Sequence, residues 1–193
     1  QEIREKYSLP KQFILYVGDI NFNKNIPKLI RSFASLEAQK SCLVLVGKAF
    51  KEGNLLEAKQ IVQLIKELKL DKKVFRLGWI PQEDLIKIYN LATVYCQPSL
   101  YEGFGLPVLE AMACGCPVVA ANTSSLPEVC GEAALLVDPN SEQEITQQLA
   151  NLIHNEQTRQ ELIKKGFTQV KKFSWRKTAL ETIKVYEKVV SIR

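Results

Sequence analysis

Short apolar runs alternate with longer amphipathic segments along most of the chain, and this alternation constrains the fold more than any other feature. The apolar runs have the length of β-strands and lie at residues 13–17, 42–46, 74–80, 93–98, 117–121 and 133–138. Between them, apolar residues recur every three or four positions, which predicts helices with one buried face, the clearest at residues 25–39, at 57–69 and after Pro81. Strands that are apolar on both faces and alternate with helices predict an α/β fold, in which helices cover both faces of a parallel sheet of about six strands.

The chain has the length and composition of one globular domain. Its 193 residues are 46% hydrophobic and 24% charged, which is enough to bury one sizeable core. We expect the α/β core at about residues 13–140 and a helical tail at 141–193, which begins with the capping-box sequence S-E-Q-E at 141–144. No apolar run approaches the roughly 20 residues of a membrane-spanning helix and the first residues lack a signal-peptide core, so we expect a cytoplasmic protein.

Several common chemistries have no support in the sequence. Five cysteines occur without a C-x-x-C pair, which argues against a zinc site or a disulfide framework and favours reduced, buried thiols. The single histidine, His154, lies in polar surroundings, so a Ser-His-Asp or Cys-His arrangement lacks a credible base. No D-x-D or H-x-x-x-H motif offers a metal site, and no G-x-G-x-x-G follows the first strand, which argues against a dinucleotide oxidoreductase.

The last thirty residues are strongly basic. Residues 164–193 hold nine lysines and arginines against two acids, although the whole chain carries a formal charge of only +5. A basic tail can contact nucleic acid or an anionic membrane surface. We favour the alternative of an amphipathic helix packed on the domain, because apolar residues recur at helical spacing at Ala179, Ile183, Tyr186 and Val190.

Ligands of such parallel sheets bind beyond the carboxyl ends of the strands, and one loop there combines features of a phosphate site. Gly103 and Gly105 flank Phe104 and allow a tight turn, and Pro107 suits the first turn of a helix. The N–H groups around Gly105 and Leu106 then lack partners inside the helix, and with the helix dipole they favour a phosphate group.

Two acids border the same helix start, with Glu102 before the turn and Glu110 about one turn inside the helix. A carboxylate accepts two hydroxyl hydrogen bonds at once, so each acid suits the hydroxyl-bearing parts on one side of a diphosphate. That arrangement fits a nucleotide sugar better than a bare nucleotide. The alternative is that Glu102 is a solvated loop acid and that Glu110 stabilises the helix N-terminus.

The loop after the first strand adds a second element to this site. Gly18 allows close backbone approach, and Lys24 lies at the start of the following helix. A lysine there suits a diphosphate, and a cation at a helix N-terminus is otherwise mildly unfavourable. We favour this interpretation over a solvent-facing lysine.

Taken together, these residues resemble the carboxyl-terminal domain of retaining glycosyltransferases of the GT-B fold, in the large family numbered four. E-G-F-G-L-P-V-L-E at 102–110 resembles the family's E-x7-E signature, and the likeness continues through "EAMACGCPVVAANTSSLPEVCGEAALLVDP". The resemblance implies half of a GT-B fold, which is a Rossmann-like domain. It also implies transfer of a sugar from a UDP-, GDP- or ADP-sugar to a glycan, lipid or small-molecule acceptor, with retained configuration and no required metal or other cofactor.

Carried over by position, the resemblance implies a role for each candidate residue. Glu102 would hold hydroxyls of the donor sugar, and Glu110 would bind the ribose. The N–H groups of Gly105 and Leu106, in the turn that includes Gly103 and Phe104, would bind the diphosphate. Lys24 would bind phosphate and stabilise the leaving group, so Lys24 and Glu102 are the expected catalytic residues; Gly18 would lie near the donor and Ile80 would contact the base.

The sequence departs from the family pattern in two ways. Many members place an arginine in the first loop, where this chain has Asp19 and Asn23, and Lys48 is one substitute for that cation. The amino-terminal, acceptor-binding domain is also missing from this sequence, so we expect a chain that binds a nucleotide sugar and transfers poorly or not at all alone. The expected partners are therefore a nucleotide sugar and that missing domain; nucleic acid is not expected, and the tail leaves room for a peripheral membrane contact.

Three other functions stay open at this point. An epimerase or a phosphorylase can use the same fold, and a phosphorylase would need a cofactor lysine. A degenerate site would make the chain a non-catalytic module that only binds a nucleotide sugar or a protein partner. A nucleic-acid-binding protein has only the basic tail in its favour.

Overall fold

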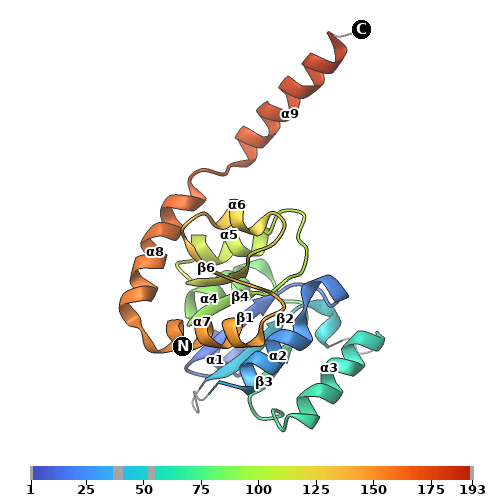
Figure 1. Ribbon diagram of the computed structural model, residues 1–193, viewed down its shortest axis with the longest axis vertical. Coiled ribbons are helices and arrows are strands. Elements are labelled where there is room, and N and C mark those ends of the chain that lie inside the picture. The colour runs from blue at the N-terminus through green and yellow to red at the C-terminus, as the bar shows by residue number, and fades with distance from the viewer. Residues whose placement is uncertain (1, 37–40, 52–54, 192–193) are drawn as a thin grey trace.

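The structure is a computed structural model that describes residues 2–36, 41–51 and 55–191 (Figure 1). Its strands form one parallel sheet in the order β3-β2-β1-β4-β5-β6. All of the predicted strands are present, and only the third is clearly shorter than expected, because it ends at Leu77. The strands are β1 (Phe13–Val17), β2 (Cys42–Val46), β3 (Val74–Leu77), β4 (Val94–Gln97), β5 (Val118–Ala121) and β6 (Ala134–Val137).

Helices cover both faces of this sheet, as the sequence predicts, and each face has its own apolar core. One face is covered by α2 (Ile26–Ala34), α3 (Leu56–Glu67) and α7 (Glu142–His154). The other face is covered by α1 (Glu2–Lys6), α4 (Gln82–Leu91), α5 (Leu106–Ala113) and α6 (Leu126–Cys130). Two short 3₁₀ helices, η1 (Phe22–Lys24) and η2 (Lys48–Phe50), follow β1 and β2.

The predicted periodicities match the buried faces of the helices. In α2, Ile26, Leu29, Ile30 and Phe33 are at most 4% exposed, because their three- and four-residue spacing places them in one stripe. The helix ends at Ala34, earlier than predicted, and residues 37–39 of the predicted helix lie outside the described residues. The predicted helix at 57–69 is observed as α3 with nearly the same limits.

Helix α1 is not predicted from the sequence, and contacts distant along the chain hold it in place. Asp84 in α4 accepts hydrogen bonds from Lys6 Nζ at 2.7 Å and from the Tyr7 hydroxyl at 2.6 Å. These hydrogen bonds hold the pKa of the Asp84 carboxyl below its usual value, and the one from Lys6 has the larger effect. The amino-terminal segment is therefore pinned to α4.

The capping box at the start of the helical tail forms only in part. Ser141 Oγ accepts from the Glu144 N–H at 3.1 Å, as predicted. The Glu144 carboxylate accepts from the Asp138 N–H at 2.9 Å instead of reaching back to Ser141. The helix is capped, and its acid ties it to the end of β6.

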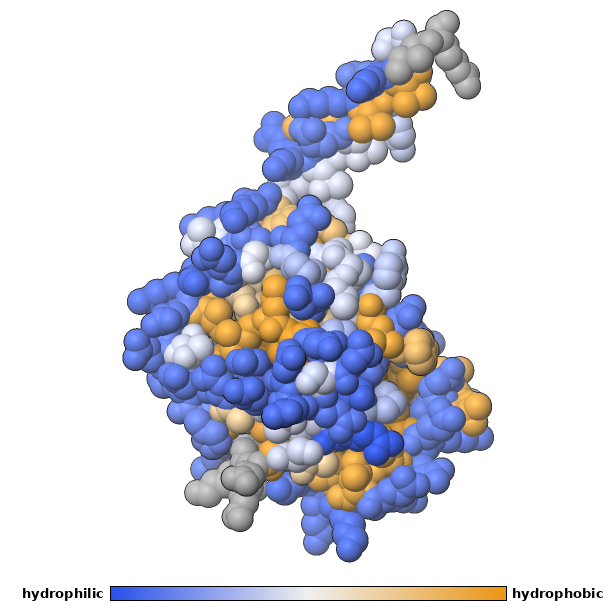
Figure 2. All heavy atoms as spheres, viewed as in Figure 1, coloured by the Kyte–Doolittle hydropathy of each residue, from blue (hydrophilic) through white to orange (hydrophobic). Residues whose placement is uncertain are grey.

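The tail divides into a packed part and an extended part. Helix α7 packs on α2, and α8 (Glu156–Val170) packs along α5. Helix α9 (Trp175–Val190) has no buried residue and projects away from the domain (Figure 1). The expectation that Ala179, Ile183, Tyr186 and Val190 pack on the domain is therefore wrong, because helical spacing predicts an apolar stripe but not the surface that covers it. Figure 2 shows apolar residues along the exposed α9.

None of the described helices combines the length and the hydropathy that a membrane crossing requires.

Candidate functional site

The sheet reverses its winding direction between β1 and β4. The chain adds β2 and β3 on one side of β1 and then returns to place β4 on the other side. In open parallel sheets, ligands bind at the carboxyl edge beside such a reversal. The loops after β1 and β4 hold most of the residues predicted from the sequence, including Lys24 and Glu102, so the topology brings them to the same place.

Two glycines leave bare backbone at the carboxyl ends of β1 and β2. The Gly18 N–H donates to the Val46 carbonyl at 2.9 Å, and the Gly47 N–H donates to the Leu77 carbonyl at 3.2 Å. A Cβ on Gly47 would overlap the Gly18 carbonyl oxygen, and a Cβ on Gly18 would lie 2.6 Å from the Tyr16 hydroxyl. Glycine at position 47 therefore allows the two backbones to approach closely, and glycine at position 18 leaves room for the buried Tyr16 side chain.

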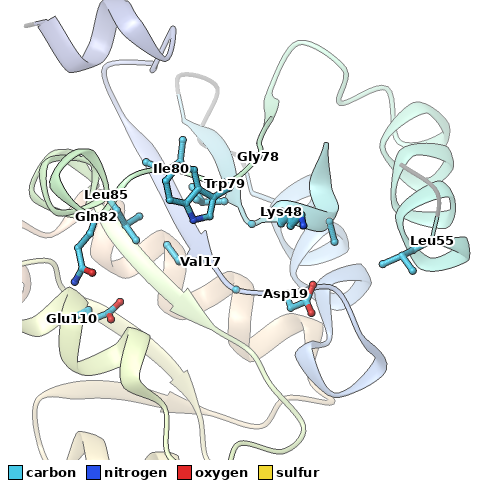
Figure 3. Close-up of a pocket in the computed structure, with 14 residues that line it drawn as sticks. Val17, Asp19, Lys48, Leu55, Gly78, Trp79, Ile80, Gln82, Leu85 and Glu110 are labelled. Atoms are coloured by element: carbon cyan, nitrogen blue, oxygen red, sulfur yellow. The ribbon is translucent and has the colours of Figure 1, made fainter. Parts of the chain in front are cut away.

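A cleft of about 740 Å³ opens beside these glycines (Figure 3). Its walls come from the segments that follow β1, β2 and β3 and from α4 and α5. Three of the predicted residues line it together, namely Gly18, Ile80 and Glu110. The volume lies within the range of small-molecule sites.

Glu110 presents a carboxylate to this cleft from α5. Its Oε2 accepts a hydrogen bond from the Tyr89 hydroxyl at 3.1 Å. Burial, together with the nearby Glu110 charge, raises the pKa of Tyr89, so the phenol stays a neutral donor. Within the described part of the chain Oε1 has no hydrogen-bond partner, which leaves it able to accept from a ligand hydroxyl.

The cleft also holds residues that the predictions missed or left secondary. Trp79 lines it with 73% of its surface exposed, whereas the neighbouring Ile80, the predicted base contact, is 7% exposed. The signal in the sequence was the aromatic residue directly after Gly78, in the loop where the base contact was sought. Lys48, the predicted substitute cation, and Asp19 line the same cleft.

Lys24 and Glu102 form an ion pair with each other. Lys24 Nζ lies 2.8 Å from Glu102 Oε1 and 2.9 Å from Oε2, and the side chains are 22% and 10% exposed. The pair joins the loop after β1 to the loop after β4, and the Leu100 N–H donates to the Asn23 carbonyl at 2.7 Å beside it. The sequence predicted each residue as a ligand contact and did not predict this pairing.

Two further buried side chains hold the Glu102 carboxylate. Gln97 and Ser99, exposed by 1% and 0%, donate to Glu102 Oε1 at 2.5 Å and 2.7 Å. The signal for them was a glutamine inside an otherwise apolar strand, because a buried amide needs partners.

The turn before α5 has the predicted backbone geometry. Gly105 has φ 102° and is the N-cap of α5, and a Cβ there would lie 2.8 Å from Leu126 Cδ2. Within the described residues the N–H groups of Gly105 and Leu106 have no acceptor, which leaves both donors for an anion. The Gly103 position faces open space.

Phe104 in the same turn packs against another part of the protein. Its ring packs edge-to-face on Phe173, with centroids 5.8 Å apart, so part of it contacts the segment between α8 and α9. Phe104 is still 43% exposed. The residues of the turn, together with Lys24 and Glu102, do not line the 740 Å³ cleft. The predicted site thus forms two neighbouring parts, the cleft and the loop pair at the β1–β4 reversal.

The cysteine thiols and the possible metal ligands do not add to this site. The five cysteines are free thiols, of which Cys96, Cys116 and Cys130 are buried; burial raises the pKa of Cys130 to about 12. No group of three or more His, Cys, Asp or Glu side chains suited to a metal ion occurs in the described ranges.

Comparisons with known proteins place the chain in a family. The model of the family described as "Glycosyl transferases group 1" matches residues 1–169. The O-antigen chain mannosyltransferase B of Escherichia coli is 36% identical over 189 residues, which are 96% of this chain and 48% of that protein.

Solved structures share the fold. The sucrose-phosphate synthase of Thermosynechococcus elongatus is 30% identical with a TM-score of 0.86, over 100% of this chain and 49% of that one. Anabaena Alr3699/HepE, solved in complex with UDP and glucose, has a TM-score of 0.82 at 21% identity, over 98% of this chain and 51% of that one. The chain therefore spans about half the length of these relatives.

Proposed function

The chain belongs to the glycosyl transferases group 1 family, and we propose that it is the donor-binding half of a retaining glycosyltransferase that uses a nucleotide diphosphate sugar. One observation carries this proposal. Gly18, Ile80 and Glu110, which the family resemblance assigns to the donor site, come from three segments far apart in the chain and line a single cleft.

The contacts suggest how the donor lies. The base rests against Ile80 and the exposed Trp79, and the ribose hydroxyls donate to Glu110 Oε1, the carboxylate oxygen that Tyr89 does not bind. The diphosphate binds the N–H groups of Gly105 and Leu106 at the start of α5 and the ammonium of Lys24. Lys48, which lines the cleft, supplies part of the positive charge that the first-loop arginine gives other members.

Chemistry follows from the same groups. When the bond between the sugar and the diphosphate breaks, negative charge grows on the departing nucleotide, and Lys24 and the start of α5 stabilise it. Glu102 orients the sugar through its hydroxyls. We place the acceptor site in the part of the relatives that these 193 residues do not span, so the 193 residues by themselves should bind the donor and transfer little or nothing.

Calorimetric titration tests the proposal. UDP, GDP and ADP are titrated into the 193-residue chain, each with and without an attached hexose, and one base series is expected to bind at micromolar to millimolar concentration. Glu110→Ala should weaken that binding about 10- to 100-fold, because a hydrogen bond to a charged group contributes about 1.5–3 kcal/mol. Glu161→Ala, at an exposed acid on α8 outside the cleft, is the matched control and should bind as wild type does.

Two results would contradict the proposal. One is the absence of binding by any of the three nucleotides at millimolar concentration. The other is equal affinity of wild type and Glu110→Ala, which would remove the cleft from the site.

A further inference from the structure

The two oxygens of the Glu102 carboxylate have unequal surroundings. Oε1 accepts from Gln97 Nε2 at 2.5 Å, from Ser99 Oγ at 2.7 Å and from Lys24 Nζ at 2.8 Å. Among the described residues, Oε2 accepts only from Lys24 Nζ, at 2.9 Å. Oε1 is therefore saturated by the protein, and Oε2 depends on a single flexible side chain.

A directed chain of hydrogen bonds fixes the donors to Oε1. The Tyr95 hydroxyl donates to Gln97 Oε1, and burial raises the pKa of Tyr95, so the phenol keeps its proton. This contact turns the amide of Gln97 so that its nitrogen faces Glu102. Gln97 Nε2 also donates to Ser99 Oγ at 2.9 Å, so the one hydroxyl proton of Ser99 points to Glu102.

The donors are also rigid. Gln97 lies in β4 and is 1% exposed, and Ser99 follows two residues later and is fully buried. Lys24 is different, because its long side chain comes from η1 and keeps 22% exposure. A negatively charged ligand at the neighbouring N–H groups of Gly105 and Leu106 competes with Glu102 for this ammonium.

We propose that Gln97 and Ser99 are positioning residues for the donor sugar, which hold Glu102 Oε1 so that Oε2 receives the sugar hydroxyls when Lys24 turns to the diphosphate. This inference rests on the proposed function. The contribution of the sugar to the binding free energy then depends on Gln97 and Ser99. The contribution of the nucleotide diphosphate does not depend on them.

The test separates these two contributions. For each protein, calorimetry gives the dissociation constants of a nucleotide diphosphate and of the matching nucleotide sugar, and their ratio measures what the sugar adds. Ser99→Ala is expected to lower this ratio about three- to tenfold, as for the loss of one hydrogen bond, while the affinity for the diphosphate changes less than twofold. Gln97→Met keeps the side-chain length and should also lower this ratio. It replaces Ser99→Ala as the test if Ser99→Ala does not fold.

A matched control detects a merely structural effect. Thr123 Oγ1 donates to the Ser99 carbonyl at 3.0 Å, so Thr123→Val loosens the same loop without removing a donor to the carboxylate. Its ratio should equal that of wild type.

The outcomes distinguish this inference from the proposed function. If wild type binds no nucleotide diphosphate, both are overturned. If wild type binds the diphosphate but the sugar adds nothing, or if Ser99→Ala and Gln97→Met leave the ratio unchanged or lower it no more than Thr123→Val, only the positioning role is overturned.

Discussion

The ion pair between Lys24 and Glu102 should stabilise the ligand-free protein measurably. Exposed pairs contribute about 0.2–1 kcal/mol, and breaking a buried pair costs about 3–5 kcal/mol. This pair lies between the two cases, with 22% and 10% exposure and contacts to both carboxylate oxygens. We expect Lys24→Met to lower the free energy of unfolding by about 1–3 kcal/mol, since Glu102 keeps its donors Gln97 and Ser99.

A double-mutant cycle measures the pairing itself. Wild type, Lys24→Met, Glu102→Gln and the double variant are unfolded in urea, and the expected coupling between the two sites is about 1–2 kcal/mol. The slope of unfolding free energy against urea should not change. For a chain of this size, each kcal/mol lowers the melting temperature by about 2–4 °C, which gives a second reading.

A surface pair provides the control for this cycle. Lys28 Nζ lies 3.3 Å from Glu142 Oε1, with side chains 30% and 39% exposed, so Lys28→Met should cost less than about 1 kcal/mol. The reasoning is refuted if the effects of Lys24→Met and Glu102→Gln add to within about 0.5 kcal/mol of the double variant, because sites that do not interact behave in that way.

Three further predictions concern the frame around the site. Gly47→Ala should destabilise the protein by about 1–3 kcal/mol, because the added Cβ would overlap the Gly18 carbonyl oxygen. Gly103→Ala is the control and should be nearly neutral, because a Cβ there meets nothing within 4 Å. Equal urea midpoints for the two variants would contradict the close approach of Gly47 to Gly18. Asp84→Asn should lower the stability at neutral pH, because the hydrogen bond from Lys6 lowers the pKa of Asp84 in the folded protein. As the pH falls below about 4, the usual aspartate pKa, and then through the lowered pKa of the folded protein, the urea midpoints of wild type and variant should converge. A difference between the midpoints that stays constant with pH would refute the assignment. Removal of α9, which has no buried residue, should change the free energy of unfolding by less than about 0.5 kcal/mol, and a larger loss would mean that α9 packs on the domain in solution.

Local sequence patterns predicted most of the fold. Apolar runs and helical spacing are set by residues within a few positions of one another, so the strands and the buried faces of α2 and α3 follow directly from them. The turn at Gly105 was predictable for the same reason, because glycine adopts a positive φ at little cost and Pro107 suits the first turn of a helix. Helix α1 was missed, since its placement depends on the contact of Tyr7 with Asp84, 77 residues away.

The candidate site was predictable only as a set of separate residues. Gly18 and Glu102 lie in loops that follow a strand, and Glu110 lies about one turn inside a helix, which was visible in the sequence. Their division into a cleft and a loop pair was not visible. Gln97 also escaped notice, because the pattern marks position 97 as buried strand and says nothing about which polar group its amide meets.

By itself, the sequence determined the type and order of the elements from β1 onward and the edge of the sheet at which we expect a ligand, because periodicity and turn chemistry act between near neighbours. Only the tertiary structure decided that Lys24 is paired with Glu102, 78 residues away, and that Glu102 Oε2 has Lys24 as its one partner among the residues that the structure describes. It also decided that α9 leaves the domain. The physical reason is the same in each case: spacing along the chain fixes which face a side chain occupies, and the packing of distant segments fixes what it meets there.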